Sequence, residues 1–208
     1  VHVDGGGTLL ATESCLLNGN RNPTLSKQQI ERVLCETLGV AKIIWLPVGL
    51  LCDTDTDGHV DNFACFAREG VVLLAWCEDQ CGDPQQHRVC AEAEAILLGE
   101  TDAEGRPLEV VRVPLPPPLH YTREEAEAIE GGARTPGEQI CASYINFCWN
   151  GDHRVIIPGF GAPDADRRAK AIFEKALPGR EVIQLQIGRA LALGGGNMHC
   201  MTCHQPSA

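Results

Sequence analysis

The 208-residue sequence lacks several features that would place it in common classes of protein. It has no run of about 18 apolar residues, so no transmembrane helix is predicted. Its 17 Lys and Arg are outnumbered by 28 Asp and Glu, and a net charge of −11 argues against a nucleic-acid partner. That charge mainly favours solubility, and it weakly favours a cationic partner through long-range attraction.

The start of the chain lacks the usual opening features. No methionine, signal peptide or helix cap precedes the strand predicted at Val1–Val3, so a targeting sequence is neither seen nor excluded. We therefore expect the chain to be a fragment whose N-terminal part is absent.

Cysteine, in contrast, is abundant, with 11 residues. A disulfide framework is typical of much shorter secreted chains. Five cysteines fall in apolar or periodic segments and are predicted to be small buried hydrophobes: Cys15, Cys35, Cys65, Cys90 and Cys148. We therefore predict mostly free thiols and a reducing compartment.

One order of predicted elements, strand-strand-helix-strand, recurs three times. The first unit has strands at Val1–Val3 and Thr8–Thr12, a helix over Ser26–Thr37 and a strand at Lys42–Leu46. The second has strands at Val60–Ala67 and Val71–Cys77, a helix over Pro84–Leu98 and a strand at Glu109–Val113. The third has strands at Ser143–Trp149 and Arg154–Pro158, a helix over Asp164–Leu177 and a strand at Val182–Gln186.

A fourth unit is predicted to begin at Leu191. Repeats of this length usually indicate a radial or stacked architecture. The alternative is an ordinary α/β sheet with accidental similarity between its parts. The proline-rich segment 114–139 is predicted to be a surface excursion with one short helix at Arg123–Ile129, because proline clusters do not fit a central strand.

Four carboxylates and one histidine fall within ten residues, between Asp53 and Asn62. His59 and Asp61 are two residues apart at the start of a predicted strand, so their side chains should point to the same face. A histidine and a carboxylate on one face suit acid–base chemistry, with the carboxylate also holding a cation, or metal binding. The alternative is a solvated acidic turn followed by a histidine in the core.

The spacing Asp53-x-Asp55-x-Asp57-Gly58 resembles the first half of a calcium-binding loop. The twelfth position of such a loop is a bidentate glutamate, and here it is Ala64. Calcium binding is therefore disfavoured.

Near its end, the chain carries Gly194–Gly196 and then Cys200. Glycines let the backbone approach a ligand closely, and a cysteine on a tight turn suits a nucleophile whose proton partner is distant in sequence. The same segment contains Cys200-x-x-Cys203-His204, which matches the c-type haem attachment pattern. An unreactive buried cysteine, a haem site and a zinc site remain alternatives, although zinc would need a fourth ligand.

Taken together, these residues resemble the agmatine deiminase family of guanidine-modifying enzymes. The matching segments extend from Val1 to nearly Ala208: 2–5, 12–18, 21–23, 44–47, 58–63, 142–147, 178–182 and 194–200. The resemblance implies an α/β fold of the pentein type, which is a propeller of strand-strand-helix-strand units. This chain would hold about three units and the start of another. Residues 1–208 would form a single partial agmatine deiminase-like domain whose N-terminal part is missing.

The resemblance implies hydrolytic deimination of agmatine to N-carbamoylputrescine and ammonia, a step of polyamine and putrescine biosynthesis. Cys200 would be the nucleophile that forms a covalent thiouronium intermediate. His59 would protonate the departing ammonia and then activate water. Asp61 would hold the guanidinium group through charge-assisted hydrogen bonds.

The resemblance also implies a set of substrate-binding residues besides Asp61. Asp55 stands where the family often has an acidic residue near the distal amine of the substrate. Gly195, Gly196 and Asn197 would belong to the turn that presents Cys200 to the substrate. No metal or organic cofactor is implied.

Four positions depart from the family pattern and bear on substrate tuning rather than on thiol chemistry. Asp57 stands where the family commonly has Asn, and Gly6 where it has Glu. Cys203 and His204 replace residues that are usually glutamines. Under oxidation, Cys203 would form a disulfide with Cys200 and inactivate it as a nucleophile. This is a hypothesis. Activity that is lost in peroxide and is not regained with a reductant would contradict it.

The resemblance leads to further expectations about the whole protein. The partner would be a small cationic guanidine, with no nucleic acid or membrane, in a cytoplasmic enzyme that forms a homodimer at full length. The family also supplies a second guanidinium-binding aspartate from before Val1, so we expect this chain alone to have little or no activity and to expose strand edges. Alternatives are a bacterial-type peptidyl-arginine deiminase, an inactive remnant or binding module, and a haem or metal protein.

Overall fold

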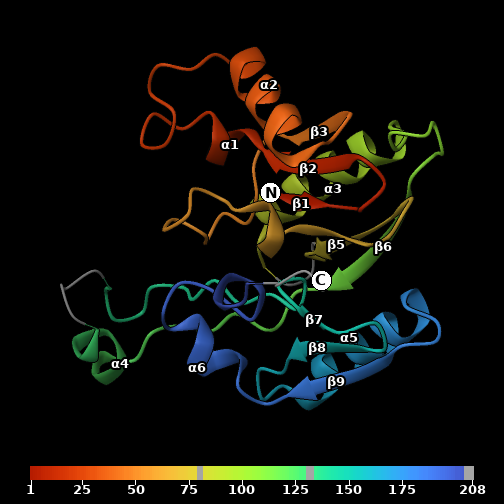
Figure 1. Ribbon diagram of the computed structural model, residues 1–208. Helices are drawn as coiled ribbons and strands as arrows, with labels where there is room; N and C mark the ends of the chain where they lie inside the picture. Colours follow the sequence, from red (N-terminus) through yellow and green to blue (C-terminus); the bar gives the residue numbers. More distant parts are fainter. Residues whose placement is uncertain (79–81, 130–133, 204–208) are drawn as a thin grey trace.

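The computed structural model describes residues 1–78, 82–129 and 134–203, which form three mixed three-stranded sheets (Figure 1). In each sheet the first strand is antiparallel to the second, and the third is parallel to it. A helix connects the second strand to the third in every case, because parallel neighbours need a crossover. The described chain thus repeats one topology three times.

The first unit contains β1 (His2–Val3), β2 (Thr8–Thr12), α1 (Glu13–Leu16), α2 (Lys27–Leu38) and β3 (Lys42–Leu46). The second contains a 3₁₀ turn η1 (Val60–Asn62), β4 (Ala64–Arg68), β5 (Val71–Trp76), α3 (Pro84–Leu98) and β6 (Glu109–Pro114). After α4 (Arg123–Ala128), the third has β7 (Cys148–Asn150), β8 (Arg154–Pro158), α5 (Pro163–Ala176) and β9 (Glu181–Leu185). The end of the described chain holds α6 (Gly188–Ala192) and a 3₁₀ turn η3 (His199–Met201).

Local signals set the bounds of α2, which lie one residue later at each end than the predicted range Ser26–Thr37. The Ser26 side chain accepts a hydrogen bond from the Gln29 amide, and the Gln29 side chain accepts one from the Ser26 amide, which completes a capping box. Gly39 closes the helix with φ +68°, a left-handed conformation that glycine adopts without strain.

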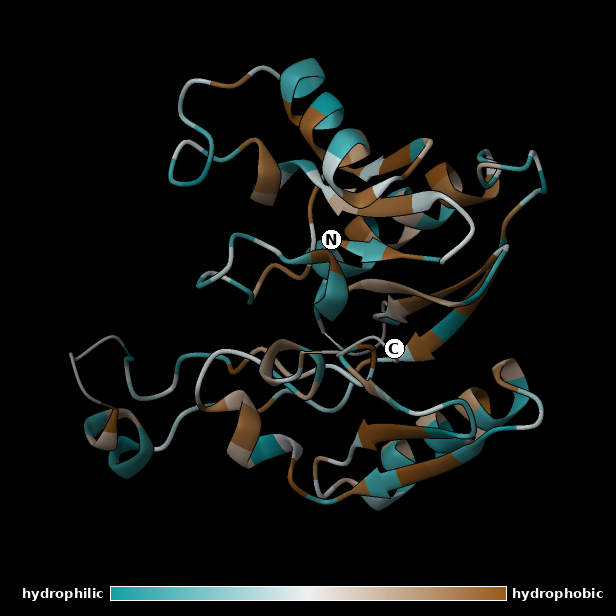
Figure 2. Ribbon diagram, viewed as in Figure 1, coloured by the Kyte–Doolittle hydropathy of each residue, from teal (hydrophilic) through white to brown (hydrophobic). Residues whose placement is uncertain are grey.

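Most of the core lies between the second and third units. All six residues of β5 are buried, and α5 packs against both β6 and β9. The largest fully buried side chains include Phe63, Phe66, Tyr144, Phe147 and Phe173. Figure 2 shows hydrophobic residues along the strands and hydrophilic residues on the outer turns of α2. A smaller core lies between the first sheet and α2.

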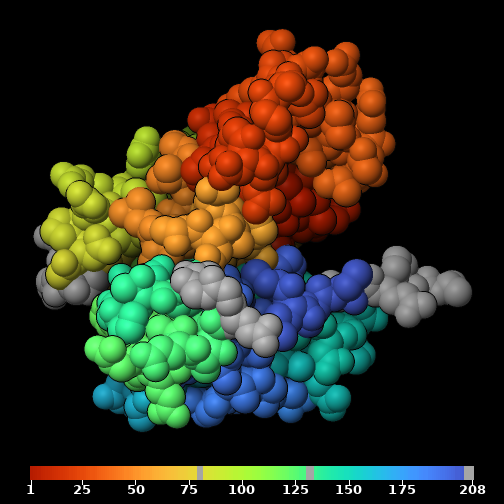
Figure 3. Space-filling model, turned by 90° about the vertical axis from the view of Figure 1, so that its left-hand side faces the viewer, coloured from red at the N-terminus to blue at the C-terminus, as the bar shows by residue number. Residues whose placement is uncertain are grey.

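The third unit lies beside the first two across the molecule. In Figure 3 the first unit, in red and orange, stands above the third unit, in blue-green and blue. The first and second units meet where β1 contacts β4. There the Phe66 amide donates a hydrogen bond to His2 Nδ1, at 3.2 Å. No helix in the described part of the chain is long and apolar enough to cross a membrane.

Two predicted strands are shorter than expected. The strand predicted at Val60–Ala67 begins only at Ala64, because Val60–Asn62 forms η1. The strand predicted at Ser143–Trp149 is reduced to Cys148–Asn150, and the residues before it are buried irregular backbone. The fourth unit expected from Leu191 is not seen in the described residues either: residues 188–203 contain α6 and η3 but no strand.

Eight described cysteines are free thiols: Cys15, Cys35, Cys52, Cys65, Cys141, Cys148, Cys200 and Cys203. Four of the five predicted to be buried are so, and Cys35 is only partly buried. The short helix predicted at Arg123–Ile129 is present as α4, one residue shorter.

Candidate active site

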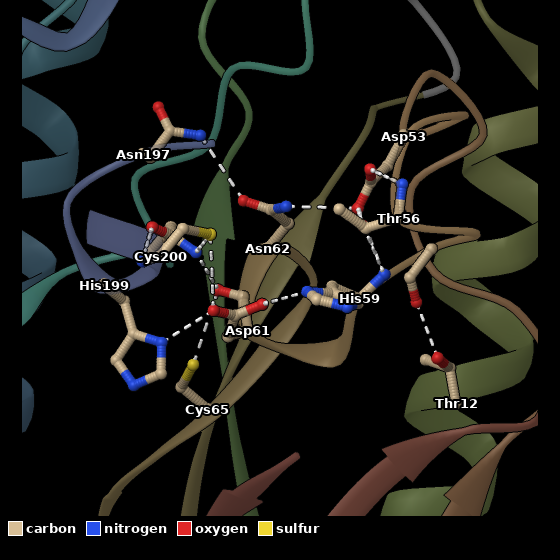
Figure 4. Close-up of polar contacts among 12 residues, drawn as sticks. Thr12, Asp53, Thr56, His59, Asp61, Asn62, Cys65, Asn197, His199 and Cys200 are labelled. Carbon is tan, nitrogen blue, oxygen red and sulfur yellow. Dashed lines mark hydrogen bonds and ion pairs between the residues drawn. The ribbon is translucent and has the colours of Figure 1, made fainter. Parts of the chain in front are cut away.

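The loop before β4 is organised by one buried carboxylate, Asp53. Its Oδ2 accepts hydrogen bonds from Thr56 Oγ1 at 2.6 Å, the His59 amide at 3.0 Å and Asn62 Nδ2 at 3.1 Å (Figure 4). Gly58, with φ +81°, packs so closely on Gly49 that a Cβ would lie 3.0 Å from the Gly49 nitrogen. Asp53 therefore fixes the loop that presents His59.

His59 and Asp61 were predicted to lie at the start of a strand. They lie instead at the start of the turn η1. Their side chains nevertheless approach each other, with His59 Nδ1 at 3.7 Å from Asp61 Oδ1. Arg21 Nη2 lies 2.9 Å from His59 Nε2. Because a guanidinium only donates, Nε2 accepts, and the proton of the neutral imidazole sits on Nδ1, facing Asp61. Burial, followed by the charge of Arg21, outweighs the effect of Asp61 and lowers the pKa of His59.

Asp61 is the most connected side chain of the site. Its Oδ2 lies 2.6 Å from His199 Nδ1, and its carboxylate is only 8% exposed. Burial would raise its pKa, but the hydrogen bond and charge of His199, together with His59, lower the pKa to about 2. Its Oδ1 is buried without a hydrogen-bond partner among the described residues. The carboxylate is therefore ionised and retains a free acceptor.

Cys200 belongs to η3, and its sulfur faces Asp61. Sγ lies 3.5 Å from Asp61 Oδ2 and 3.1 Å from Asn146 Nδ2. Partial burial of the sulfur, and then the negative charge of Asp61, raise the pKa of Cys200 above its ordinary value. The resting side chain is a thiol that donates to Asp61.

The glycines before Cys200 are required by close contacts. Gly195 has φ +86°, and a Cβ there would lie 2.5 Å from Asp55 Oδ2. A Cβ on Gly196 would lie 2.8 Å from the Cys200 Cβ. Glycine therefore lets the turn pack against both Asp55 and the thiol-bearing residue.

A cavity of about 670 Å³ opens beside this turn and brings the predicted chemical residues together. The residues around it come from the start of the chain, the loop before β4, α6 and the tail: Val1, Thr56, His59, Asp61, Ala190, Leu191, Gly194, Gly195, Gly196, His199, Cys200 and Met201. His59, Asp61, Gly195, Gly196 and Cys200 were all candidates from the sequence. The cavity has room for a small ligand.

Asp55 and Asn197, two other candidates, do not line this cavity. Asn197 is fully buried and points inward, donating to Asn62 Oδ1 at 3.3 Å and to the Cys141 carbonyl at 3.1 Å. Asp55 lies behind Gly195, and both of its oxygens accept from Arg134. Asn197 thus supports the turn, and Asp55 adjoins it as half of an ion pair.

Sequence reasoning missed three residues of the site, namely His199, Asn146 and His2. His199 directly precedes Cys200, and its ring lies 5.7 Å from that of His2. Burial, and then the charge of His199, lower the pKa of His2 to about 3. Asn146 lies within the quoted segment 142–147, but no spacing rule links it to a cysteine 54 residues later.

The haem and zinc alternatives gain no ligand cluster from the described residues. No group of three or more His, Cys, Asp or Glu in 1–78, 82–129 and 134–203 is arranged to hold a metal ion. His204, the last residue of the haem-like pattern, lies outside the described residues.

The fold and the site together define an α/β protein with a cysteine, a histidine and a carboxylate around one cavity. The chain belongs to the family of Porphyromonas-type peptidyl-arginine deiminases, whose family model matches residues 1–206.

Individual relatives confirm the resemblance to agmatine deiminases. The agmatine deiminase of Medicago truncatula is 47% identical over 211 residues, and that of Pseudomonas fluorescens Pf-5 is 49% identical over 212. Each alignment covers the whole of this chain and 56% of the relative. The solved agmatine deiminase of Enterococcus faecalis is 37% identical with a TM-score of 0.83, over 95% of this chain and 53% of that one. The chain thus spans little more than half the length of these relatives.

Proposed function

We propose that this protein deiminates agmatine, converting its guanidinium group to a urea with release of ammonia. The observation that carries the proposal is that Cys200 Sγ and His59 Nδ1 lie 3.5 Å and 3.7 Å from the two oxygens of one buried carboxylate, Asp61. The agmatine deiminases among the relatives support the choice of substrate.

Asp61 is suited to recognise the guanidinium. Its ionised Oδ1 has no hydrogen-bond partner in the described structure, and a guanidinium offers N–H donors in a planar array. A charge-assisted hydrogen bond there satisfies a buried acceptor and neutralises a buried charge. The central carbon of the guanidinium is then held beside the cysteine sulfur.

Substrate binding also activates Cys200 in this proposal. The negative charge of Asp61 holds the resting sulfur in its thiol form, and a bound cation offsets that charge. The thiolate attacks the guanidinium carbon and forms a C–S bond. Neutral His59 takes the proton lost by the thiol on Nε2, which Arg21 releases, and passes it to the departing nitrogen. The C–N bond breaks, and ammonia leaves a thiouronium on Cys200.

Water then resolves the intermediate. His59, neutral again, takes a proton from a water molecule, whose oxygen attacks the thiouronium carbon. The C–S bond breaks, the sulfur regains a proton, and the product is N-carbamoylputrescine. The second proton of that water ends on the sulfur, which restores the thiol. The proton on His59 passes to solvent and carries away the positive charge of the thiouronium.

The far end of the substrate separates agmatine from an arginine side chain in a peptide. Asp55 lies behind Gly195, outside the cavity lining, and both of its oxygens accept from Arg134. The choice of agmatine therefore rests on the agmatine deiminases among the relatives. Peptidyl-arginine deimination, which the family description names, is the second candidate because it uses the same reacting groups.

The test measures ammonia and ureido product from agmatine and from an arginine-containing peptide. Two preparations are compared: the 208-residue chain, and a chimaera that adds the part of the Medicago relative outside the matched region. Cys200, His59 and Asp61 come from this chain in both. Product from agmatine that disappears in Cys200→Ser supports the proposal. A folded chimaera that acts only on the peptide supports the second candidate, and one that acts on neither overturns both.

A further inference from the structure

Asn146 is a completely buried residue that links Cys200 to the backbone of Asp61. Its Nδ2 lies 3.1 Å from Cys200 Sγ and donates to the Asp61 carbonyl at 3.3 Å. Its Oδ1 accepts from the Cys200 amide at 3.2 Å, and its own carbonyl accepts from the His199 amide at 3.4 Å. One side chain thus contacts the backbone and the sulfur of Cys200 at once.

The hydrogen-bond network fixes which way this amide points. Only the Asn146 oxygen can accept from the Cys200 amide, so its NH₂ group faces the sulfur. That group remains a donor whether the sulfur is a thiol or a thiolate. A hydrogen bond to an ionised acceptor is roughly twice as strong as a neutral one, so the contact favours the thiolate.

We propose that Asn146 is a catalytic residue that aims the Cys200 sulfur and donates a hydrogen bond to its thiolate. The proposal rests on the proposed role of Cys200 as the nucleophile. It assigns the third unit a chemical contribution beyond packing, since Asn146 precedes β7 while Asp61 precedes β4.

Other groups around the sulfur also influence the pKa of the Cys200 thiol. Asp61 opposes the thiolate from 3.5 Å, while the Asn197 backbone N–H favours it. Behind Asp61 lie three imidazoles, those of His59, His199 and His2. The negative charge of an ionised Cys200 also raises the pKa of the Cys65 and Cys141 thiols. A substitution of the Asn146 side chain leaves these residues in the sequence, and it removes the hydrogen bond to the Asp61 carbonyl together with the donor to the sulfur.

The test is the pH dependence of Cys200 alkylation by iodoacetamide, which does not require turnover. Peptide mass spectrometry follows the Cys200 peptide separately from the other cysteines, over a pH range of about 6 to 11, because the pKa of Cys200 is raised above the ordinary cysteine value. Asn146→Ala removes the donor, and the near-isosteric Asn146→Asp replaces it with an acceptor. Gln86→Ala, which removes a buried amide of α3, is the control for a general loss of packing.

We expect Asn146→Ala to slow alkylation about tenfold at pH 7 by moving the midpoint upward, with the high-pH plateau nearly unchanged. Asn146→Asp should move the midpoint further, and Gln86→Ala should leave it in place. An unmoved midpoint in Asn146→Asp, or the same slowing at every pH, would overturn the proposal.

The two proposals fail in different ways. A shifted midpoint without agmatine turnover by the folded chimaera sustains the role of Asn146 at the sulfur and rejects the deiminase. Turnover of agmatine with an unmoved midpoint rejects the role of Asn146 alone.

Discussion

Asp61 is the residue on which the candidate site depends, because every reacting group lies against it. It takes a 2.6 Å hydrogen bond from His199, faces His59, and holds the thiol proton of Cys200. The sequence predicted His59, Asp61 and Cys200 because a known family motif carries them. It could not predict His199 as a partner, since the contact spans 138 positions that only the fold brings together.

The charge of Asp61 can be tested at the thiol itself with two related alkylating reagents. Chloroacetamidine is cationic and resembles a guanidinium, whereas chloroacetamide is neutral. Two unit charges about 4 Å apart attract by about 4 kcal/mol at an intermediate dielectric, so we expect Cys200 to prefer the amidine at least about tenfold at pH 7. Asp61→Asn should lose most of this preference, measured by mass spectrometry of the Cys200 peptide.

Cys203 provides an internal control for that experiment, because it is exposed and close in sequence. It should show no dependence on Asp61. A preference for the amidine that survives in Asp61→Asn would show that another group attracts the cation.

His2 should make the folded state sensitive to mild acid. Burial lowers its pKa from 6.5 to about 3, so between these values the unfolded chain binds a proton that the folded chain does not. The free energy of unfolding therefore falls as pH decreases through this window, by up to about 1.4 kcal/mol per pH unit. Urea unfolding at several pH values above about 5, where Asp61 is ionised in both states, measures the slope.

Replacing His2 with Gln removes the titrating group, so the slope should become shallower than in the native sequence. His153→Gln is the matched control, because His153 is exposed. Equal slopes for the native chain and His2→Gln would contradict the account of the buried imidazole.

At the scale of elements, regular patterns predicted well and buried irregular segments did not. The bounds of α3, β3 and β8 match their predictions because periodicity and terminal residues agree there. Residues 143–147 were predicted as part of a strand, and they are buried but contain the polar Ser143 and Asn146. Instead, the carbonyl of Asn146 bonds to the His199 amide and that of nearby Cys141 to Asn197 Nδ2, so the tail replaces a neighbouring strand.

The capping box of α2 gives a prediction at this scale. Ser26→Ala removes the acceptor for the Gln29 amide and should lower the free energy of unfolding by about 1 kcal/mol. Ser26→Asp keeps an acceptor at the same place and should cost only a few tenths of that. Urea denaturation compares the two variants, and equal losses would mean that the cap does not stabilise the helix.

For the whole molecule, three sheets of one topology position a site that no single unit contains. The loop before the second sheet contributes His59 and Asp61, the segment before the third contributes Asn146, and the tail contributes Cys200. The sequence predicted the repeat because each unit has its own turns and apolar strands. Its radial, fivefold arrangement stays a prediction, and the relatives extend well beyond the matched region.

The most direct measurement of the central claim is the mass of the protein during reaction with agmatine. The chain and the chimaera are mixed with agmatine, quenched in acid, and digested for peptide mass spectrometry. The account predicts an adduct with the mass of agmatine less ammonia on the Cys200 peptide of the active preparation, absent from Cys200→Ser. Product formation by Cys200→Ser, or an adduct on a different cysteine, would contradict it.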